Sequence, residues 1–243
     1  MSNEPVLDAT SSAGILTLTL NRPAARNALN LALTEVLMTQ LKIFDTDPSL
    51  RVMILTGADP AFCAGLDLKD FSDPASPRER VAALLDEFPH RAKPVIGAVN
   101  GAAMTGGLEL AISCDFLIAS ERARFGDTHS KIGALAGGGM NSRLPHAVGL
   151  RWAKQLAFSC IPIDAETALR VGLVNEVVAH ARLLPRAMEL AAAIAAHDPE
   201  LIGTVKGVLD QGAQQTLAEA IRLEHDTLAA RKARGAMNWN AGR

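Results

Sequence analysis

Short, nearly continuous apolar runs alternate with amphipathic stretches over residues 1–182. The apolar runs predict strands at Ile15–Leu20, Val52–Thr56, Val95–Val99, Phe116–Ala119 and Val174–Val178. Several of these runs are nearly all apolar, which is typical of strands that are covered on both faces. The alternation of strands with helical patterns predicts an α/β layered fold for this part of the chain.

Apolar positions three and four residues apart predict the helices. One helix follows Asn30, and its apolar stripe consists of Leu33, Val36, Leu37, Leu41 and Phe44. A capping-box pattern at Ser76–Glu79 predicts the start of a second helix. The remaining helices are predicted at Asp164–Arg170, Arg182–Ala196, Asp198 to about Gln211, and around Leu217–Leu228. Residues 183–243 contain no convincing strand, so we expect them to form a helical region that serves oligomerisation.

Composition and charge exclude several classes of protein. The 243 residues are 49% hydrophobic and 21% charged, which excludes a disordered chain, and the net charge of −2 provides no basic surface for nucleic acid. Residues 94–108, the longest stretch without a charge, are too short and too rich in glycine to span a membrane. The three cysteines are too far apart to form a metal knuckle. With no signal-peptide pattern at the N-terminus, we expect a cytoplasmic protein without a bound metal.

Three segments combine the end of an apolar run with a turn of small residues. They are residues 61–67, 100–109 and 125–129. In open α/β folds, ligands bind beyond the ends of strands, where small residues let a ligand approach backbone N–H groups. Ordinary tight turns between packed elements are the alternative interpretation of each segment.

Glu109 is the only carboxylate between Lys93 and Asp115, and its neighbours are apolar. If a helix begins near Gly106, Glu109 lies in its first turn, where burial and the helix N-terminus act on its charge in opposite directions. A partly buried carboxylate of this kind suits a general acid or base. A capping glutamate that faces solvent is the alternative.

Other catalytic motifs are absent from the sequence. It contains no GxSxG, HExxH or GxxxxGK[ST] pattern, and Gly137–Gly139 is interpreted as a flexible turn. Of the six histidines, only His129 lies in one of the three candidate segments.

Together these residues resemble the crotonase superfamily, the enoyl-CoA hydratase/isomerase family. The matching stretches occur in order along the chain: Leu20–Pro23 with Asn27–Leu29, Val52–Gly57, Phe62–Leu68, Pro94–Gly101, Gly106–Asp115 and Ala168–Val177. The resemblance covers residues 6 to 230. It implies a spiral of ββα units with two roughly perpendicular small sheets and a C-terminal helical assembly region that forms a homotrimer or a dimer of trimers.

The resemblance also assigns roles to individual residues. It implies that residues 1–182 bind an acyl-CoA thioester and that no other cofactor is needed, since coenzyme A is part of the substrate. The amides of Ala64 and Gly106 are expected to form an oxyanion hole beside Glu109. The substrate-binding residues expected from the resemblance are Ala28, Gly65, Leu66, Asp67, Leu68 and Gly107.

The sequence departs from the family pattern at one catalytic position. Family hydratases use two glutamates, and the second falls where this chain has His129. A Glu109/His129 pair can still hydrate a double bond, since histidine exchanges protons near neutral pH. Asp127 is an alternative if it turns inward. Three hypotheses follow: an enoyl-CoA hydratase, an isomerase that uses Glu109 alone, and a weakly catalytic acyl-CoA-binding protein.

Overall fold

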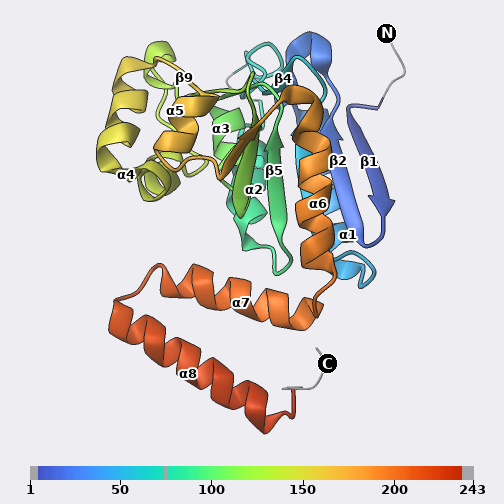
Figure 1. The fold of residues 1–243 in the computed structure, drawn as a ribbon. Helices are drawn as coiled ribbons and strands as arrows, with labels where there is room; N and C mark the ends of the chain where they lie inside the picture. The colour runs from blue at the N-terminus through green and yellow to red at the C-terminus, as the bar shows by residue number, and fades with distance from the viewer. Residues whose placement is uncertain (1–4, 74–75, 237–243) are drawn as a thin grey trace. The chain divides into compact units, whose positions relative to one another are not determined.

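The structure is a computed structural model that describes residues 5–73 and 76–236. Within these ranges, ten strands form two sheets (Figure 1). The larger sheet has the order β1-β2-β3-β5-β7-β10, with bounds Leu7–Ser12, Ile15–Leu20, Val52–Gly57, Val95–Val99, Phe116–Ser120 and Glu176–Val178. The smaller sheet has the order β4-β6-β8-β9, with bounds Ala61–Cys63, Ala102–Met104, Arg124–Gly126 and Ile163–Asp164. Only the pairs β1–β2 and β8–β9 are antiparallel in the described part of the chain.

A unit of two strands and one helix occurs three times in succession. In each repeat the first strand enters the larger sheet, the second enters the smaller sheet, and a helix follows. These helices are α2 (Glu79–Glu87), α3 (Gly106–Ala111) and α4 (Met140–Ser159). This is the ββα spiral expected from the resemblance. Because β4, β6 and β8 are parallel neighbours, the chain leaves all three at the same edge of the smaller sheet.

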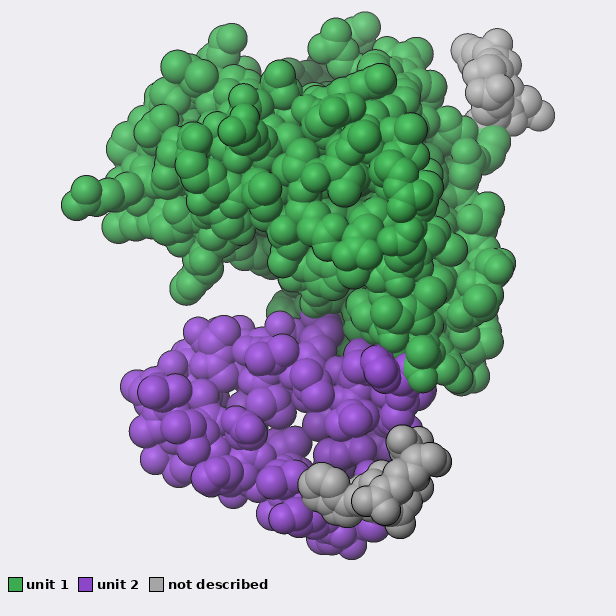
Figure 2. All heavy atoms as spheres, viewed as in Figure 1, with its two compact units in different colours: residues 1–196 green, residues 197–243 purple. Residues whose placement is uncertain are grey.

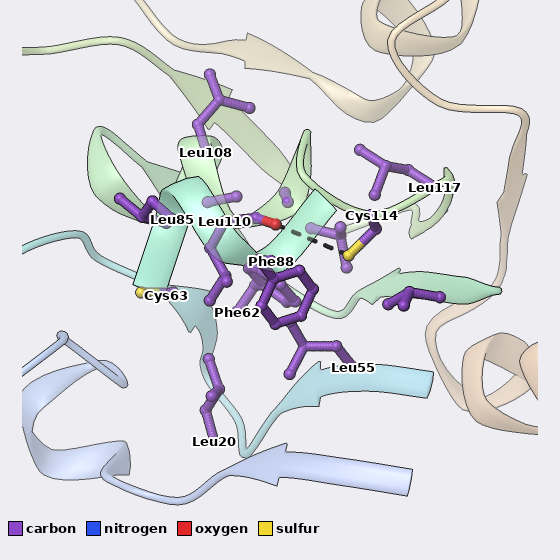
Figure 3. Packing of buried hydrophobic residues seen from close by; sticks show 14 of the residues in the cluster. Leu20, Leu55, Phe62, Cys63, Leu85, Phe88, Leu108, Leu110, Cys114 and Leu117 are labelled. Atoms are coloured by element: carbon purple, nitrogen blue, oxygen red, sulfur yellow. Dashed lines mark hydrogen bonds between the residues drawn. The ribbon is translucent and has the colours of Figure 1, made fainter. Parts of the chain in front are cut away.

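The central strands β3 and β5 of the larger sheet are covered on both faces, as their continuous apolar runs predict. Along β3, Met53 and Leu55 pack into the core beneath α1 (Leu31–Thr46) and α2, whereas Val52 and Ile54 pack under α6 (Leu183–Ala195). Successive strand residues point to opposite faces, so one apolar run supplies both cores. Figure 3 shows side chains of the larger core, which comes from both sheets and from the helices between them.

Most predicted elements are present with bounds close to those expected, but two helices differ. The helix α2 begins at Glu79 without a side-chain cap, so the predicted capping box is wrong. The Ser76 hydroxyl donates to the Asp70 carbonyl oxygen instead, at 3.3 Å. The sequence pattern does not predict the long helix α4, because Pro145 and a break at Gly149 (φ 75°, ψ 154°) interrupt its apolar periodicity.

The chain divides after Ala196 into two compact units, coloured separately in Figure 2. The first unit includes α5 (Ala165–Arg170) and ends beyond the expected residue 182, because the buried face of α6 packs on the larger sheet. The second unit contains α7 (Pro199–Gly212) and α8 (Leu217–Ala233), which pack against each other. No helix within the described ranges has both the length and the apolar character that crossing a bilayer requires.

Candidate active site

The three segments of small residues lie at one edge of the smaller sheet, as the predicted strand ends require. They border a cavity of about 620 Å³. Leu66 follows β4, Gly106 and Glu109 follow β6, and His129 follows β8. All four residues line the cavity, so each repeat of the spiral supplies part of its wall.

Glu109 is buried, with 3% of its surface exposed, and it lies in the first turn of α3 as expected. Its Oε1 accepts a hydrogen bond from the Gly138 amide at 2.7 Å and one from the Met140 amide at 3.2 Å. These donors compensate the cost of burying a carboxylate. They fix one oxygen and leave Oε2 on the side of His129.

The glycine turn Gly137–Gly139, directly before α4, holds Glu109 in place. The sequence pattern indicates only a flexible turn there and does not reveal this role. A Cβ atom at Gly138 would lie 2.3 Å from Leu85 Cδ1 and 2.9 Å from Glu109 Oε2, so only glycine fits without displacing a neighbour. Arg143 Nη1 donates to the Gly138 carbonyl oxygen at 3.0 Å and braces the turn from outside the cavity wall. Three consecutive glycines directly before a helix are the signal that the sequence carries for this turn.

His129 is oriented by Asp127, whose side chain is also buried. Asp127 Oδ1 accepts hydrogen bonds from His129 Nδ1 at 2.7 Å and from the His129 amide at 3.1 Å. The hydrogen bond to Asp127 raises the pKa of His129 above its ordinary value against the effect of burial, and the charge of Glu109 adds to the rise. Burial alone would raise the pKa of Asp127, but its hydrogen bonds with His129 outweigh burial and lower that pKa.

His129 and Glu109 face each other across the cavity. The distance between His129 Nε2 and Glu109 Oε2 is 3.9 Å, which is too long for a hydrogen bond and close enough for strong electrostatic attraction. The two groups therefore form an acid–base pair with room for a reacting group beside them.

The backbone amides differ from the expectation in one respect. The Ala64 amide is already used, since it donates to the Arg26 carbonyl oxygen at 3.0 Å. Within the described residues, the amides of Leu66 and Gly106 donate to no protein acceptor. A Cβ atom at Gly106 would lie 3.6 Å from the Leu66 nitrogen, and both residues line the cavity. The candidate donor pair is therefore Leu66 and Gly106 rather than Ala64 and Gly106.

Two glycines let these segments approach each other. Gly65 has φ +98°, and a Cβ atom there would lie 2.2 Å from Thr105 Oγ1. A Cβ atom at Gly107 would lie 2.0 Å from the Cys63 carbonyl oxygen. Gly107, expected in substrate binding, thus packs α3 against β4 and stands behind the cavity wall.

Comparisons with known proteins match this arrangement over most of the chain. The family model described as enoyl-CoA hydratase/isomerase matches residues 10–237. The chain belongs to the enoyl-CoA hydratase/isomerase family. A probable enoyl-CoA hydratase of Rhizobium meliloti is 40% identical over 228 residues, which are 92% of this chain and 88% of that protein.

Solved structures of the family have the same fold. An enoyl-CoA hydratase from Bacillus anthracis superposes with a TM-score of 0.89 at 33% identity, covering 92% of this chain and 90% of that one. An enoyl-CoA hydratase from Mycobacterium tuberculosis H37Rv is 44% identical with a TM-score of 0.79, covering 95% and 99% of the two chains. As an enzyme of the enoyl-CoA hydratase/isomerase family, this chain presents Glu109 and His129 to one cavity.

A second cavity of about 510 Å³ is lined by Ala28, Asp67 and Leu68 among others, and it shares Leu66 and Leu68 with the first. Asp67 is paired with Arg22, whose Nη2 lies 2.9 Å from Asp67 Oδ2. The Arg22 side chain also donates to the Ala28 carbonyl oxygen. Asp67 and Arg22 therefore brace this cavity, and they neutralise each other's charge. Among the described residues, no three His, Cys, Asp or Glu side chains form a group that could hold a metal ion.

Proposed function

We propose that this protein hydrates 2-enoyl-CoA thioesters through an enolate, with Glu109 as the acid–base residue. The observation that carries the proposal is the buried Glu109 carboxylate, held by two amides at the edge of the cavity that the Leu66 and Gly106 amides also border. Relatives named as enoyl-CoA hydratases at 35–40% identity support the same reaction.

The amide pair provides the stabilisation that this reaction needs. When water attacks the β-carbon of the enoyl ester, negative charge moves to the thioester oxygen. Two N–H groups aimed at that oxygen stabilise the charge, and one such donor contributes about 10²–10³-fold in rate. The thioester carbonyl would lie between Leu66 and Gly106, with its β-carbon toward Glu109.

The coenzyme A portion of the substrate would occupy the second cavity. It adjoins the first at Leu66 and Leu68, so a pantetheine chain can run from one cavity into the other. Ala28 lines this cavity. Lys69 is exposed at its edge, where its ammonium group can meet a phosphate.

Replacing Glu109 by Gln tests the proposal. The variant keeps an oxygen that accepts the Gly138 amide but loses the base, so we expect kcat to fall at least ~100-fold with little change in affinity for the ester. Glu224→Gln, at an exposed position of α8, is the matched control and should retain wild-type kcat. Near-normal turnover by Glu109→Gln would contradict the role of Glu109.

Isomerisation by Glu109 alone is the second candidate, because His129 replaces the second glutamate of family hydratases. Hydration bleaches the ultraviolet absorbance of a conjugated 2-enoyl ester, whereas isomerisation of a 3-enoyl ester creates that absorbance. Incubating the protein with each ester separately distinguishes the two reactions. Tight binding without turnover of either ester would indicate an acyl-CoA-binding protein.

We also propose a cytoplasmic homotrimer or dimer of trimers. In the described part of the second unit, Arg231 is the only buried residue, while Leu201, Leu209 and Leu217 are exposed. A helical pair that buries so little apolar surface gains stability by packing against another subunit. Light scattering of the purified protein measures the number of subunits.

A further inference from the structure

Among the described residues, the Asp127 side chain has one hydrogen-bond partner, His129. In the described part of the chain, its carboxylate accepts only from the ring and the amide of His129, and 3% of its surface is exposed. Burying a carboxylate is costly unless it is paired. The buried position of Asp127 is therefore explained by its hydrogen bonds to His129, which fix the orientation of that ring.

The contact determines which ring nitrogen of His129 faces the cavity. An ionised carboxylate 2.7 Å from Nδ1 requires a proton on that nitrogen. With Nδ1 bound to Asp127, Nε2 faces Glu109 across 3.9 Å. A carboxylate that holds a histidine in one tautomer and stabilises its imidazolium form is a known device for proton transfer.

We infer that Asp127 is a positioning residue, which holds His129 so that Nε2–H protonates the α-carbon of the enolate. The inference rests on the proposed function. Water bonds to the β-carbon and gives a proton to Glu109, while the electron pair of the double bond moves to the thioester oxygen. His129 Nε2 then gives its proton to the α-carbon: the carbon–carbon double-bond pair of the enolate forms the new C–H bond, and an electron pair on the oxygen re-forms the thioester carbonyl. Transfer of the proton from Glu109 to His129 after product release restores the starting state.

The charges around His129 favour the imidazolium form. The two anions nearest the ring are Asp127 and Glu109. The start of α2 adds one charge of each sign to the cavity lining, Arg78 and Glu79. The hydrogen bond to Asp127 raises the pKa of His129 above its ordinary value, which favours the protonated donor. Removing Asp127 should lower this pKa and move the alkaline limb of the kcat profile to lower pH.

Combining two substitutions tests whether Asp127 acts through His129. We expect Asp127→Asn to lower kcat about 10–100-fold and His129→Ala to lower it about 100-fold. Residues that act as a unit are non-additive, so the double variant should be no slower than His129→Ala alone. Multiplied losses, or an unmoved alkaline limb in Asp127→Asn, would overturn the inference. Asp8→Asn, on an exposed position of β1, is the control for the substitution itself.

A titration of the unmodified protein provides a second test if Asp127→Asn fails to fold. Nuclear magnetic resonance of ¹⁵N-labelled histidine reports the protonation of each ring nitrogen, with His129→Ala assigning the signal. We expect Nδ1 to stay protonated and the pKa to exceed the ordinary value of about 6.5. A neutral ring protonated at Nε2, or a lower pKa, would refute the positioning role. Absence of hydration by the wild-type enzyme would instead refute the proposed function and leave this measurement valid.

Discussion

Replacing Gly138 by Ala tests whether the glycine turn positions Glu109. The new Cβ atom would lie 2.9 Å from both Cδ and Oε2 of Glu109, whereas ordinary contacts begin at 3.4 Å. The carboxylate must therefore move by roughly 0.5 Å, while the Gly138 amide remains a donor. A misplacement of about 1 Å costs about 100-fold in rate, so we expect kcat to fall about 10–100-fold.

The same Cβ atom would lie 2.3 Å from Leu85 Cδ1, the far end of a flexible side chain. Its rearrangement should cost about 1–3 kcal/mol of stability, measurable by urea unfolding. Hydration is followed by the loss of ultraviolet absorbance of a 2-enoyl ester, and KM should change less than about threefold because the amide pair and the second cavity are untouched.

Gly137→Ala is the matched control, since a Cβ atom there meets nothing within 4 Å. It changes the same turn by the same methyl group without touching Glu109. If Gly138→Ala keeps kcat within about twofold of Gly137→Ala, the position of the carboxylate does not depend on this turn, and the reasoning is wrong.

Two further predictions concern the second cavity and a helix cap. Arg22→Met should raise KM for the CoA ester about 3–10-fold, equivalent to ~1 kcal/mol, with kcat little changed. The reason is that the substitution removes the side chain that joins Asp67 to the Ala28 carbonyl oxygen. Initial rates over a range of ester concentrations check this, and an unchanged KM would contradict it. Asp164→Ala should lower the free energy of unfolding by about 0.5–2 kcal/mol, because the Asp164 side chain accepts a hydrogen bond from the Thr167 amide at the start of α5. Urea unfolding measures this change. The control Asp226→Ala, in α8, should change the same free energy by less than about 0.5 kcal/mol.

The strands and the main site segments follow directly from the sequence, because both depend on local patterns. The runs Ile15–Leu20 and Val95–Val99 coincide with β2 and β5, since the apolar pattern of each run has clear ends. Glu109 stands out as an isolated carboxylate among apolar neighbours. Its place in the first turn of α3 follows from the glycines before it.

What the sequence could not reveal depends on contacts between distant segments. The acceptor of the Ala64 amide, the Arg26 carbonyl oxygen, lies in an earlier loop, and no local pattern shows that this donor is used. The role of Gly138 depends on the contact of its segment with α3. Asp127 could be named as a candidate, but its partner is decided by how the backbone turns after β8.

The distribution of the site over three successive ββα units has a consequence for biosynthesis. Leu66 belongs to the first ββα repeat and Glu109 to the second. The third ββα repeat supplies His129 and Gly138, from the stretch that joins β8 to α4. A nascent chain that ends before residue 138 lacks the amides that shelter Glu109, so catalytic competence cannot precede the synthesis of all three units.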